Sequence, residues 1–462
     1  MKKVIWGKRL AGVVLGAVTA FSMVFAPIHS YAEEGGKQVI EYFGNWHETK
    51  LSDLPWDSFT QINHSFWHVV PDTSVEGISD KTTFEAKADG DEARTAFKIE
   101  PMDTVDLGKG NYFEQYAKLH KKYPDVKIML SIGGWSGCGF FSEMAYTEEG
   151  RKSFVQSCID TMNEYPWLAG IDIDWEYPGN NVEGEDRWPA GEGDEGCPLF
   201  GTPLEDMLNF NYLLRDMREG FDAAFPDEHK ILTSCCSAST GWTLPAQDWK
   251  TASKYLDTVN VMSYDMWGGW EETSGHHTSV YWAKSAVAYL RVKGVPKEKI
   301  NIGVAYYTHT FTADDPTMAG TPGAPSEEDY GLSEELTFKD CLRFEKEAVA
   351  EGTPGWHGGY DEKDEAAYLY NDDPNSEYYG KFVSYDNERS VSKKIDFVKD
   401  QDLAGVIVWE INQDSDDFIL TKKLGDAFIE KSNECGPVII ICSVVIIIAV
   451  VGILLVKSKK KG

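Results

Sequence analysis

The chain has 462 residues, of which 42% are hydrophobic, and a formal net charge of −31 at pH 7. A chain of this length and composition can bury one large core or divide into two to three domains. The acidity argues against nucleic acid or anionic lipid as the main partner, because both are themselves negatively charged. The eight cysteines follow no metal-binding spacing, and the sequence cannot pair them into disulfides.

The first 32 residues have the composition of a secretion signal. Four basic residues within the first nine positions precede an apolar run over 10–25, and Ser30-Tyr31-Ala32 resembles a signal-peptidase site. We therefore predict a signal peptide over residues 1–32 and a mature chain that starts near Glu33. An uncleaved membrane anchor is the alternative.

Residues 437–456 form an almost wholly apolar run. At a rise of about 1.5 Å per residue, about 20 helical residues cross the roughly 30 Å of hydrocarbon in a bilayer. Four lysines follow at once in the tail 457–462, and the positive-inside rule places that tail in the cytoplasm. The sequence therefore predicts a single-pass protein of the cell membrane whose main body, residues 33–432, lies outside the cell.

Between these two segments, short apolar runs alternate with helical stretches. The eight predicted strands cover residues 39–44, 61–70, 127–134, 170–176, 230–238, 258–265, 300–307 and 405–410. The main predicted helices cover 112–122, 148–163, 204–225, 283–293 and 390–401. Eight such repeats indicate an α/β fold with a parallel (β/α)8 TIM barrel. A doubly wound open sheet is the alternative, but no glycine-rich phosphate loop follows the first strand.

Two connections in this pattern are long. Residues 308–381 are rich in Asp, Glu, Gly, Pro and Tyr, and a structureless loop of that length is not expected in a compact domain. We predict that they form a small α+β domain inserted between the seventh and eighth strands of the barrel. A second insertion, rich in glycine and acids, covers 179–201, directly after the fourth strand.

The fourth predicted strand has the most distinctive sequence in the chain. Three acids alternate there with three apolar residues: Asp172, Asp174 and Glu176 with Ile171, Ile173 and Trp175. Because side chains two apart share a face of a strand, we expect the acids inside the barrel and the apolar side chains under its outer helices. Three confined carboxylates should interact, so that at least one keeps a proton near neutral pH. Glu176, nearest the C-terminal end of the strand, is the natural proton donor.

Two other interpretations of this strand are open. A charged edge strand would hold its acids in water, but its Ile and Trp face would then need separate cover. A calcium or magnesium site would also use clustered carboxylates. Ile173 and Trp175 are bulky, however, and fit a strand better than a metal-binding loop.

Aromatic and small residues collect at the C-terminal strand ends, where the active sites of such barrels lie. The third strand ends in Ser131-Ile132-Gly133-Gly134-Trp135, the sixth leads into Met262-Ser263-Tyr264-Asp265-Met266-Trp267-Gly268-Gly269-Trp270, and the eighth ends in Val408-Trp409-Glu410. Phe43, Trp46, Phe66 and Trp67 lie near the ends of the first two strands. Acids among Trp and Tyr indicate a carbohydrate cleft, because sugar C–H faces pack on aromatic rings and carboxylates bond hydroxyls.

These motifs resemble those of the family 18 glycoside hydrolases, the chitinases, over residues 39–424. The family pattern Asp-x-x-Asp-x-Asp-x-Glu is matched by residues 169–176 except at Ala169, Ser-x-Gly-Gly by 131–134, and Met-x-Tyr-Asp by 262–265. Trp409 matches the tryptophan of the eighth strand, and the long insertion resembles that of the deep-cleft subgroup.

The seventh strand departs from the family pattern. Gly-x-Pro-x-Tyr-Gly-Arg is replaced by Gly303-Val304-Ala305-Tyr306-Tyr307-Thr308-His309. Tyr307 carries over, whereas Thr308 and His309 stand in place of the second glycine and the arginine. The region next to the insertion is therefore expected to bind differently.

The resemblance implies retaining, substrate-assisted hydrolysis of β-1,4-linked N-acetylglucosamine, in which the substrate's own acetamido oxygen attacks the anomeric carbon. It implies four catalytic residues: Glu176 as acid and base, Asp174 as orienter of the acetamido group, Asp172 as its support, and Tyr264 as donor to the acetamido oxygen. Substrate contacts are expected from Trp409, Asp265, Met262, Trp135, Gly134, Tyr42, Phe66, Tyr307 and Trp270.

The expected partner is chitin or a chitooligosaccharide, bound by a monomer that needs no metal or organic cofactor and binds no nucleic acid. The membrane is a further expected partner, through the C-terminal helix. A chitin-binding lectin without turnover and an endo-β-N-acetylglucosaminidase acting on N-glycans or peptidoglycan are the alternatives. Glu176 favours an enzyme over a lectin, and the insertion and the aromatic density favour a long chitin-binding groove.

Overall fold

A computed structural model describes residues 36–47, 49–179, 197–268, 270–324, 336–350 and 352–429. The predicted signal peptide, the predicted membrane span and most of the insertion over 179–201 lie outside these ranges. Within them, no helix combines the length and the apolar character needed to cross a membrane.

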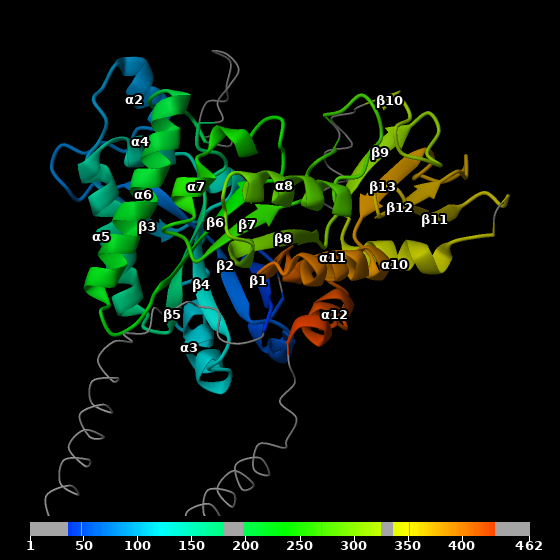
Figure 1. Ribbon diagram of the computed structural model, residues 1–462, viewed down its shortest axis with the longest axis horizontal. Coiled ribbons are helices and arrows are strands. Elements are labelled where there is room, and N and C mark those ends of the chain that lie inside the picture. The colour runs from blue at the N-terminus through cyan, green and yellow to red at the C-terminus, as the bar shows by residue number, and fades with distance from the viewer. Residues whose placement is uncertain are drawn as a thin grey trace, which may run out of the picture. The chain divides into compact units, whose positions relative to one another are not determined.

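Eight parallel strands close into a barrel (Figure 1). In sheet order they are β1 (Gln38–Gly44), β14 (Gly405–Trp409), β8 (Ile300–Ala305), β7 (Thr258–Met262), β6 (Ile231–Ser237), β5 (Leu168–Asp174), β4 (Lys127–Gly133) and β2 (Gln61–Pro71). Strand β1 pairs with both β14 and β2, which closes the sheet. The predicted TIM barrel is therefore confirmed, and the open-sheet alternative is wrong.

Helices follow the strands, and five of them lie where the sequence predicted helices, whereas those over 141–146, 249–252 and 419–428 were not predicted. They include α3 (Tyr112–Lys122), α4 (Phe141–Tyr146), α5 (Glu148–Glu164), α6 (Pro203–Ala224), α7 (Trp249–Ala252), α8 (Val280–Val292), α11 (Glu388–Gln401) and α12 (Ile419–Phe428). Helix α6 starts at a capping box, in which Thr202 and Glu205 each bond the other's backbone N–H. Strand β2 also extends beyond the barrel to pair with the antiparallel β3 (Phe97–Pro101), which follows the short α2 (Thr83–Asp89) in the sequence.

Three of the predicted strands end two or three residues earlier than expected. Strand β5 stops at Asp174 rather than residue 176, β7 at Met262 rather than 265, and β8 at Ala305 rather than 307. At β7 the chain turns directly after the strand, since the Ser263 N–H donates to the Val261 carbonyl oxygen at 2.9 Å, and Asp265 then has a φ of 57°. The residues beyond these ends leave the sheet and are free to face the barrel mouth.

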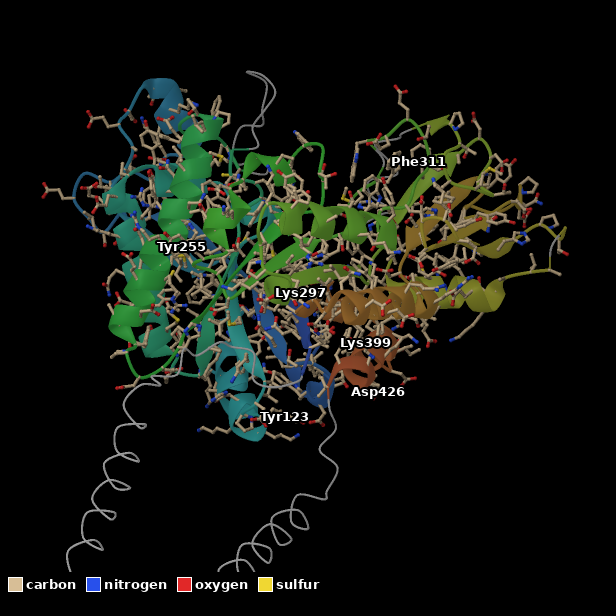
Figure 2. The ribbon with its side chains drawn as sticks, viewed as in Figure 1. Tyr123, Tyr255, Lys297, Phe311, Lys399 and Asp426 are labelled. Atoms are coloured by element: carbon tan, nitrogen blue, oxygen red, sulfur yellow. The ribbon has the colours of Figure 1, made fainter. Side chains whose placement is uncertain are left out.

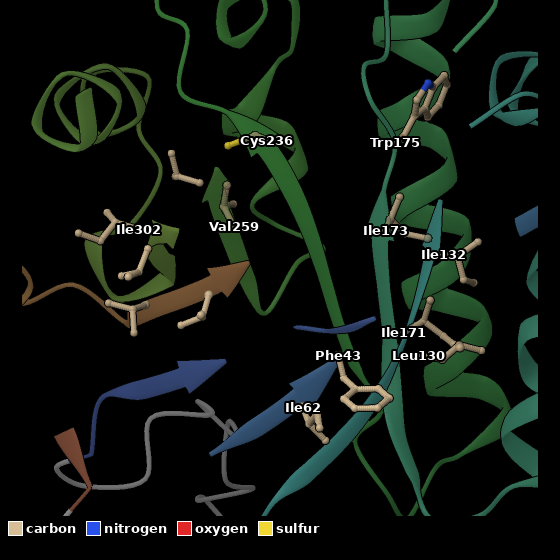
Figure 3. Packing of buried hydrophobic residues seen from close by; sticks show 14 of the residues in the cluster. Phe43, Ile62, Leu130, Ile132, Ile171, Ile173, Trp175, Cys236, Val259 and Ile302 are labelled. Carbon is tan, nitrogen blue, oxygen red and sulfur yellow. The ribbon is translucent and has the colours of Figure 1, made fainter. Parts of the chain in front are cut away.

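The outer core confirms the predicted alternation along β5. Ile171, Ile173 and Trp175 are buried in the large apolar cluster between barrel and helices, and they follow one another along the strand in Figure 3. The Trp175 ring stacks on Phe141 of α4 at a centroid distance of 5.3 Å. A smaller cluster, which includes Tyr42, lies inside the barrel. The charged-edge-strand interpretation is therefore wrong, since both faces of β5 are covered.

The segment between β8 and α11 contains a second, five-stranded antiparallel sheet in the order β10-β9-β13-β12-β11. Its elements are β9 (His309–Ala313), β10 (Gly323–Ala324), α10 (Phe338–Glu347), β11 (Trp356–Asp361), β12 (Ala366–Asn371) and β13 (Lys381–Tyr385). Phe311, labelled in Figure 2, packs with Ala313 and Phe382 on this sheet. Because β13 pairs with β9, the sheet extends to Tyr385, past the expected boundary at 381.

Candidate active site

Asp172 lies inside the barrel and is fully buried. Its carboxylate accepts hydrogen bonds from side chains of four other barrel strands: Tyr42 at 2.8 Å, Ser131 at 2.9 Å, Asn260 at 3.3 Å, and Thr233. Burial raises the pKa of Asp172, while these bonds act to lower it. Hydrogen-bond donors surround both oxygens, which leaves this carboxylate a poor ligand for the calcium or magnesium ion considered above.

Asp174 is the next inward acid, 3% exposed, and its environment differs sharply from that of Asp172. Among the described residues its Oδ1 atom has no hydrogen-bond partner. Burial raises the pKa of Asp174 well above its usual value, and the charges of Glu176 and Asp172 raise it further. A buried carboxyl oxygen is thus available to a ligand, because an unsatisfied polar atom at this position is otherwise costly.

Glu176 lies just beyond the end of β5 and is half-buried. Burial raises its pKa to about 7, helped by the charge of Asp265 and opposed by a hydrogen bond with Tyr177. Its backbone is held on both sides, since its N–H donates to Cys138 Sγ at 3.2 Å and its C=O accepts from the Cys197 N–H at 3.1 Å. A carboxyl group with this pKa can donate and accept a proton near neutral pH.

Two glycines at the C-terminal end of β4 allow the backbone to approach the end of β5. Gly133 has a φ of 115°, and a Cβ there would lie 2.2 Å from the Asp174 carbonyl oxygen. Gly134 has a φ of 75°, and a Cβ there would lie 2.6 Å from the Phe66 ring. Only glycine fits both requirements, which explains the small residues of the Ser-x-Gly-Gly motif.

Tyrosines line the space next to the acids. Tyr264 is buried beside Tyr42 and Met262, and burial together with the nearby Cys235 and Asp174 raises its pKa well above the usual value. Its hydroxyl therefore stays protonated and can act as a donor. Tyr307 lies edge-on to Tyr264 at 5.9 Å and donates to Asp265.

Aromatic rings form a stack at the ends of β1, β2 and β14. Trp409 stacks on Phe66 at 5.4 Å and lies 5.7 Å from Tyr42 and 6.1 Å from Trp46. Trp46 is 52% exposed, so the stack reaches from the barrel interior to solvent. Stacked apolar faces that are open on one side suit the C–H face of a sugar ring.

Trp135 and Trp270 occupy more peripheral positions. They are 44% and 45% exposed. Trp270 instead lies edge-on to His309 at 5.2 Å. The structure thus brings most of the predicted residues together and leaves these two tryptophans at the rim.

Several residues of the site were not predicted from the sequence. Thr233 and Asn260 bond Asp172, and Cys235 lies 3.0 Å from the Tyr42 hydroxyl. Period-2 alternation along the fifth and sixth predicted strands was the signal that could have placed these side chains inside the barrel. Trp242, 54% exposed in the loop after β6, lies on the same end of the barrel and was also missed.

His309, which stands where the family pattern has arginine, bonds Asp265 Oδ1 through Nε2 at 2.7 Å. His277 approaches the same oxygen from the loop after β7, with Nδ1 at 3.9 Å. Burial lowers the pKa of His277 well below its usual value, and the nearby His309 lowers it further. The departure noted in the sequence therefore changes the surroundings of a predicted substrate-binding residue.

Comparisons with known proteins agree with this geometry. Residues 38–414 match the family model described as glycosyl hydrolases family 18. Chitinase A of Pseudoalteromonas piscicida is 27% identical over 358 residues, which is 69% of this chain and 41% of that protein. Chitinase C of Streptomyces lividans is 27% identical over 409 residues, 82% of this chain and 58% of that protein.

A solved structure is similar over its whole length. The family 18 N-acetylglucosaminidase from Paenibacillus barengoltzii has 28% sequence identity and a TM-score of 0.62, covering 85% of this chain and 100% of that one. The two curated relatives are longer, and this chain spans only about half of their length. The family model covers well over half of the chain, and it spans the barrel, the acids of β5 and Trp409. The chain belongs to glycosyl hydrolase family 18.

Proposed function

We propose that this protein is a chitinase, which hydrolyses β-1,4-linked N-acetylglucosamine polymers with retention of configuration. The observation that carries the proposal is the pair of acids at the end of β5. Glu176 has a pKa raised to about 7, and beside it Asp174 presents a buried, unpartnered oxygen. One group can exchange protons near neutrality while the other binds a donor or a positive charge.

In the proposed reaction Glu176 protonates the glycosidic oxygen, and the acetamido oxygen of the substrate attacks the anomeric carbon. Asp174 Oδ1 accepts the acetamido N–H and offsets the positive charge of the resulting oxazolinium ion. Tyr264 donates to the acetamido oxygen, and Trp409 supports the distorted sugar. Glu176 then takes a proton from the attacking water. No second carboxylate nucleophile is needed, because the substrate supplies its own.

Asp172 acts through Asp174 in this scheme. Its four hydrogen-bond donors fix its position inside the barrel, and its charge raises the pKa of Asp174. Asp265, Met262, Tyr42, Phe66, Gly134 and Tyr307 contact the sugar nearest the acids, and Trp135 and Trp270 contact more distant units.

The test is product analysis on three substrates: chitin hexamer, a glycoprotein with N-glycans, and peptidoglycan. Chitinase activity predicts short N-acetylglucosamine oligomers from the hexamer as the main product. If N-glycans or peptidoglycan fragments were released faster than products of the hexamer, the protein would be an endo-β-N-acetylglucosaminidase instead. Binding of the hexamer without any product would assign the lectin.

The pH dependence of the reaction should follow the acids of β5. We expect kcat/KM to fall as the pH rises above about 7, because Glu176 then loses the proton that it must donate. The negative charge of Asp265 raises the pKa of Glu176, so Asp265→Asn should lower that pKa and move the basic limb to lower pH. Asp402→Asn removes a carboxylate just before β14, at the opposite end of the barrel, and should leave the limb in place. If the basic limb of the pH profile stayed in place in Asp265→Asn, the assignment of Glu176 as the proton donor would be contradicted.

We propose further that residues 33–432 are exported, that the apolar run 437–456 holds them at the outer face of the cell membrane, and that the protein is monomeric. The support is the composition of the two terminal segments and the four lysines after the apolar run. A chain truncated after residue 436 should appear in the medium with full activity, whereas the whole chain should sediment with membranes. Equal amounts of both forms in the medium would contradict the anchor.

A further inference from the structure

We propose that Asp265, His277 and His309 form a binding site for a divalent transition-metal ion of the zinc type, at the edge of the active site. The metal has no part in the hydrolysis proposed above. It would instead be an inhibitor that binds among residues expected to contact substrate.

The geometry of the three side chains fits such an ion. Their ligand atoms all lie within 4.8 Å of one another. The Asp265 Oδ1 atom is 2.7 Å from His309 Nε2 and 3.9 Å from His277 Nδ1. Tetrahedral bonds of about 2.0–2.1 Å place zinc ligands about 3.3 Å apart, and the two distances bracket that value. Metal binding would break the long hydrogen bond that His277 Nδ1 accepts from the Asp265 N–H at 3.5 Å and would bring the three ligand atoms closer to that spacing.

The chemistry of the ligand set also favours zinc over calcium or magnesium. Two imidazole nitrogens and one carboxylate are typical of zinc sites that keep a fourth position open, whereas calcium and magnesium prefer oxygen ligands. An arginine at position 309, as in the family pattern, would offer no lone pair to a metal. The presence of His309 therefore provides a ligand that the family pattern lacks.

The site is rigid on one side and accessible on the other. His277 is fully buried, and its backbone N–H donates to Ser384 Oγ at 3.0 Å, which ties it to the inserted sheet. Asp265 has a side chain that is 50% exposed, so an ion can enter from solvent. The acidic charge of the chain raises the local concentration of cations.

A neighbouring histidine belongs to a different group. His276 is 4% exposed and lies with Asp361 and Asp364 of the inserted sheet, its Nε2 atom 3.5 Å from Asp361 Oδ2. The adjacent histidines His276 and His277 thus belong to two separate clusters. His276→Gln therefore tests whether zinc binds at the second cluster instead.

The predicted effect of zinc on hydrolysis rests on the chitinase activity proposed above. The metal would replace the hydrogen bond between Asp265 and His309 and draw Asp265 away from Tyr307. It would also cancel the negative charge of Asp265 that acts on Glu176. Zinc should therefore inhibit hydrolysis, and magnesium should not. Direct binding needs no substrate, so the site can be tested even if the proposed activity is wrong.

The experiment is calorimetric titration of the full, metal-stripped chain in detergent with zinc chloride, in a buffer that does not bind metals. The wild type should bind one ion at this site, and His309→Gln should weaken that binding by at least about tenfold, the loss seen even for outer-sphere changes. His229→Gln is the matched control, because His229 pairs with Asp257 at 2.8 Å and belongs to neither cluster found among the described residues. It should bind zinc as the wild type does.

Loading with cobalt distinguishes direct metal binding by His309 from a structural effect of its replacement. Wild-type protein loaded with Co²⁺ should show the visible absorption of a tetrahedral site, and His309→Gln should lose it while its melting temperature stays close to that of the wild type. No zinc binding by the wild type, equal loss in His229→Gln, or loss in His276→Gln instead of His309→Gln would each overturn the proposal. Zinc binding without inhibition of hexamer hydrolysis would overturn its link to the active site.

Discussion

Replacement of Glu176 by glutamine is expected to lower kcat on chitin hexamer by about 10²–10⁴-fold, the usual contribution of a general acid or base. Glutamine has nearly the shape of the carboxylic acid but cannot transfer a proton to the glycosidic oxygen. The affinity for the hexamer should stay close to that of the wild type, because the aromatic stack around Trp409 and the tyrosines remain. Steady-state kinetics combined with calorimetric binding of the hexamer would measure both quantities.

Glu41→Gln is the matched control for this substitution. Glu41 is a second buried glutamate of the same barrel, but it neighbours Tyr42 on β1 and therefore points out of the barrel, near Asp414. Burial raises the pKa of Glu41 well above its usual value, but the side chain lies outside the barrel, so glutamine of nearly the same shape should leave turnover close to that of the wild type. Wild-type turnover in Glu176→Gln, or an equal loss in Glu41→Gln, would contradict the assignment of the general acid.

Strand β5, with Asp172 and Asp174, shows how much of this fold can be predicted from the sequence. Alternation alone placed Asp172 and Asp174 inside the barrel and Ile173 in the outer core, because the period of a strand leaves no other arrangement once both faces are buried. The same reasoning extended the strand to Glu176, whereas β5 stops at Asp174. Hydrophobic pattern locates a strand but does not determine where its pairing ends.

Contacts that depend on register or on loops could not be predicted. Thr233 and Asn260 reach Asp172 only because β5, β6 and β7 align these positions, and no local pattern sets that alignment. The thiol of Cys138 meets the Glu176 N–H through a turn after β4. The cis peptide bonds at Ser65–Phe66, Glu176–Tyr177 and Trp409–Glu410 precede no proline and so leave no trace in the sequence.

The inserted unit between β8 and α11 could be predicted only in part. Its length and composition predicted an α+β unit between the last two barrel strands, because an ordered loop of more than 70 residues is not expected. The individual strands were not predicted, since β9 to β13 are short and the turns between them vary. The histidines that join this unit to Asp265 could be located only from the fold.

Replacement of Asp174 by asparagine should have the second-largest effect, a fall in kcat of about 10²–10³-fold, as for loss of one group that stabilises transition-state charge. The unpartnered Asp174 Oδ1 would become either an amide nitrogen or a neutral oxygen. Neither offsets the positive charge of the oxazolinium ion, and an amide nitrogen cannot accept the acetamido N–H. The KM should change much less than kcat, because that charge is absent from the bound substrate.

A double-mutant comparison distinguishes this role from simple damage to the site. If Asp174 and Glu176 act in one step, the Asp174→Asn/Glu176→Gln variant should be hardly slower than Glu176→Gln alone, because residues that act as a unit are strongly non-additive. Independent contributions would instead multiply, and the double variant would be slower by the full product of the two losses. Multiplicative losses with unchanged melting temperatures would mean that Asp174 binds substrate without serving the step that Glu176 catalyses, and the substrate-assisted mechanism would then lose its main support.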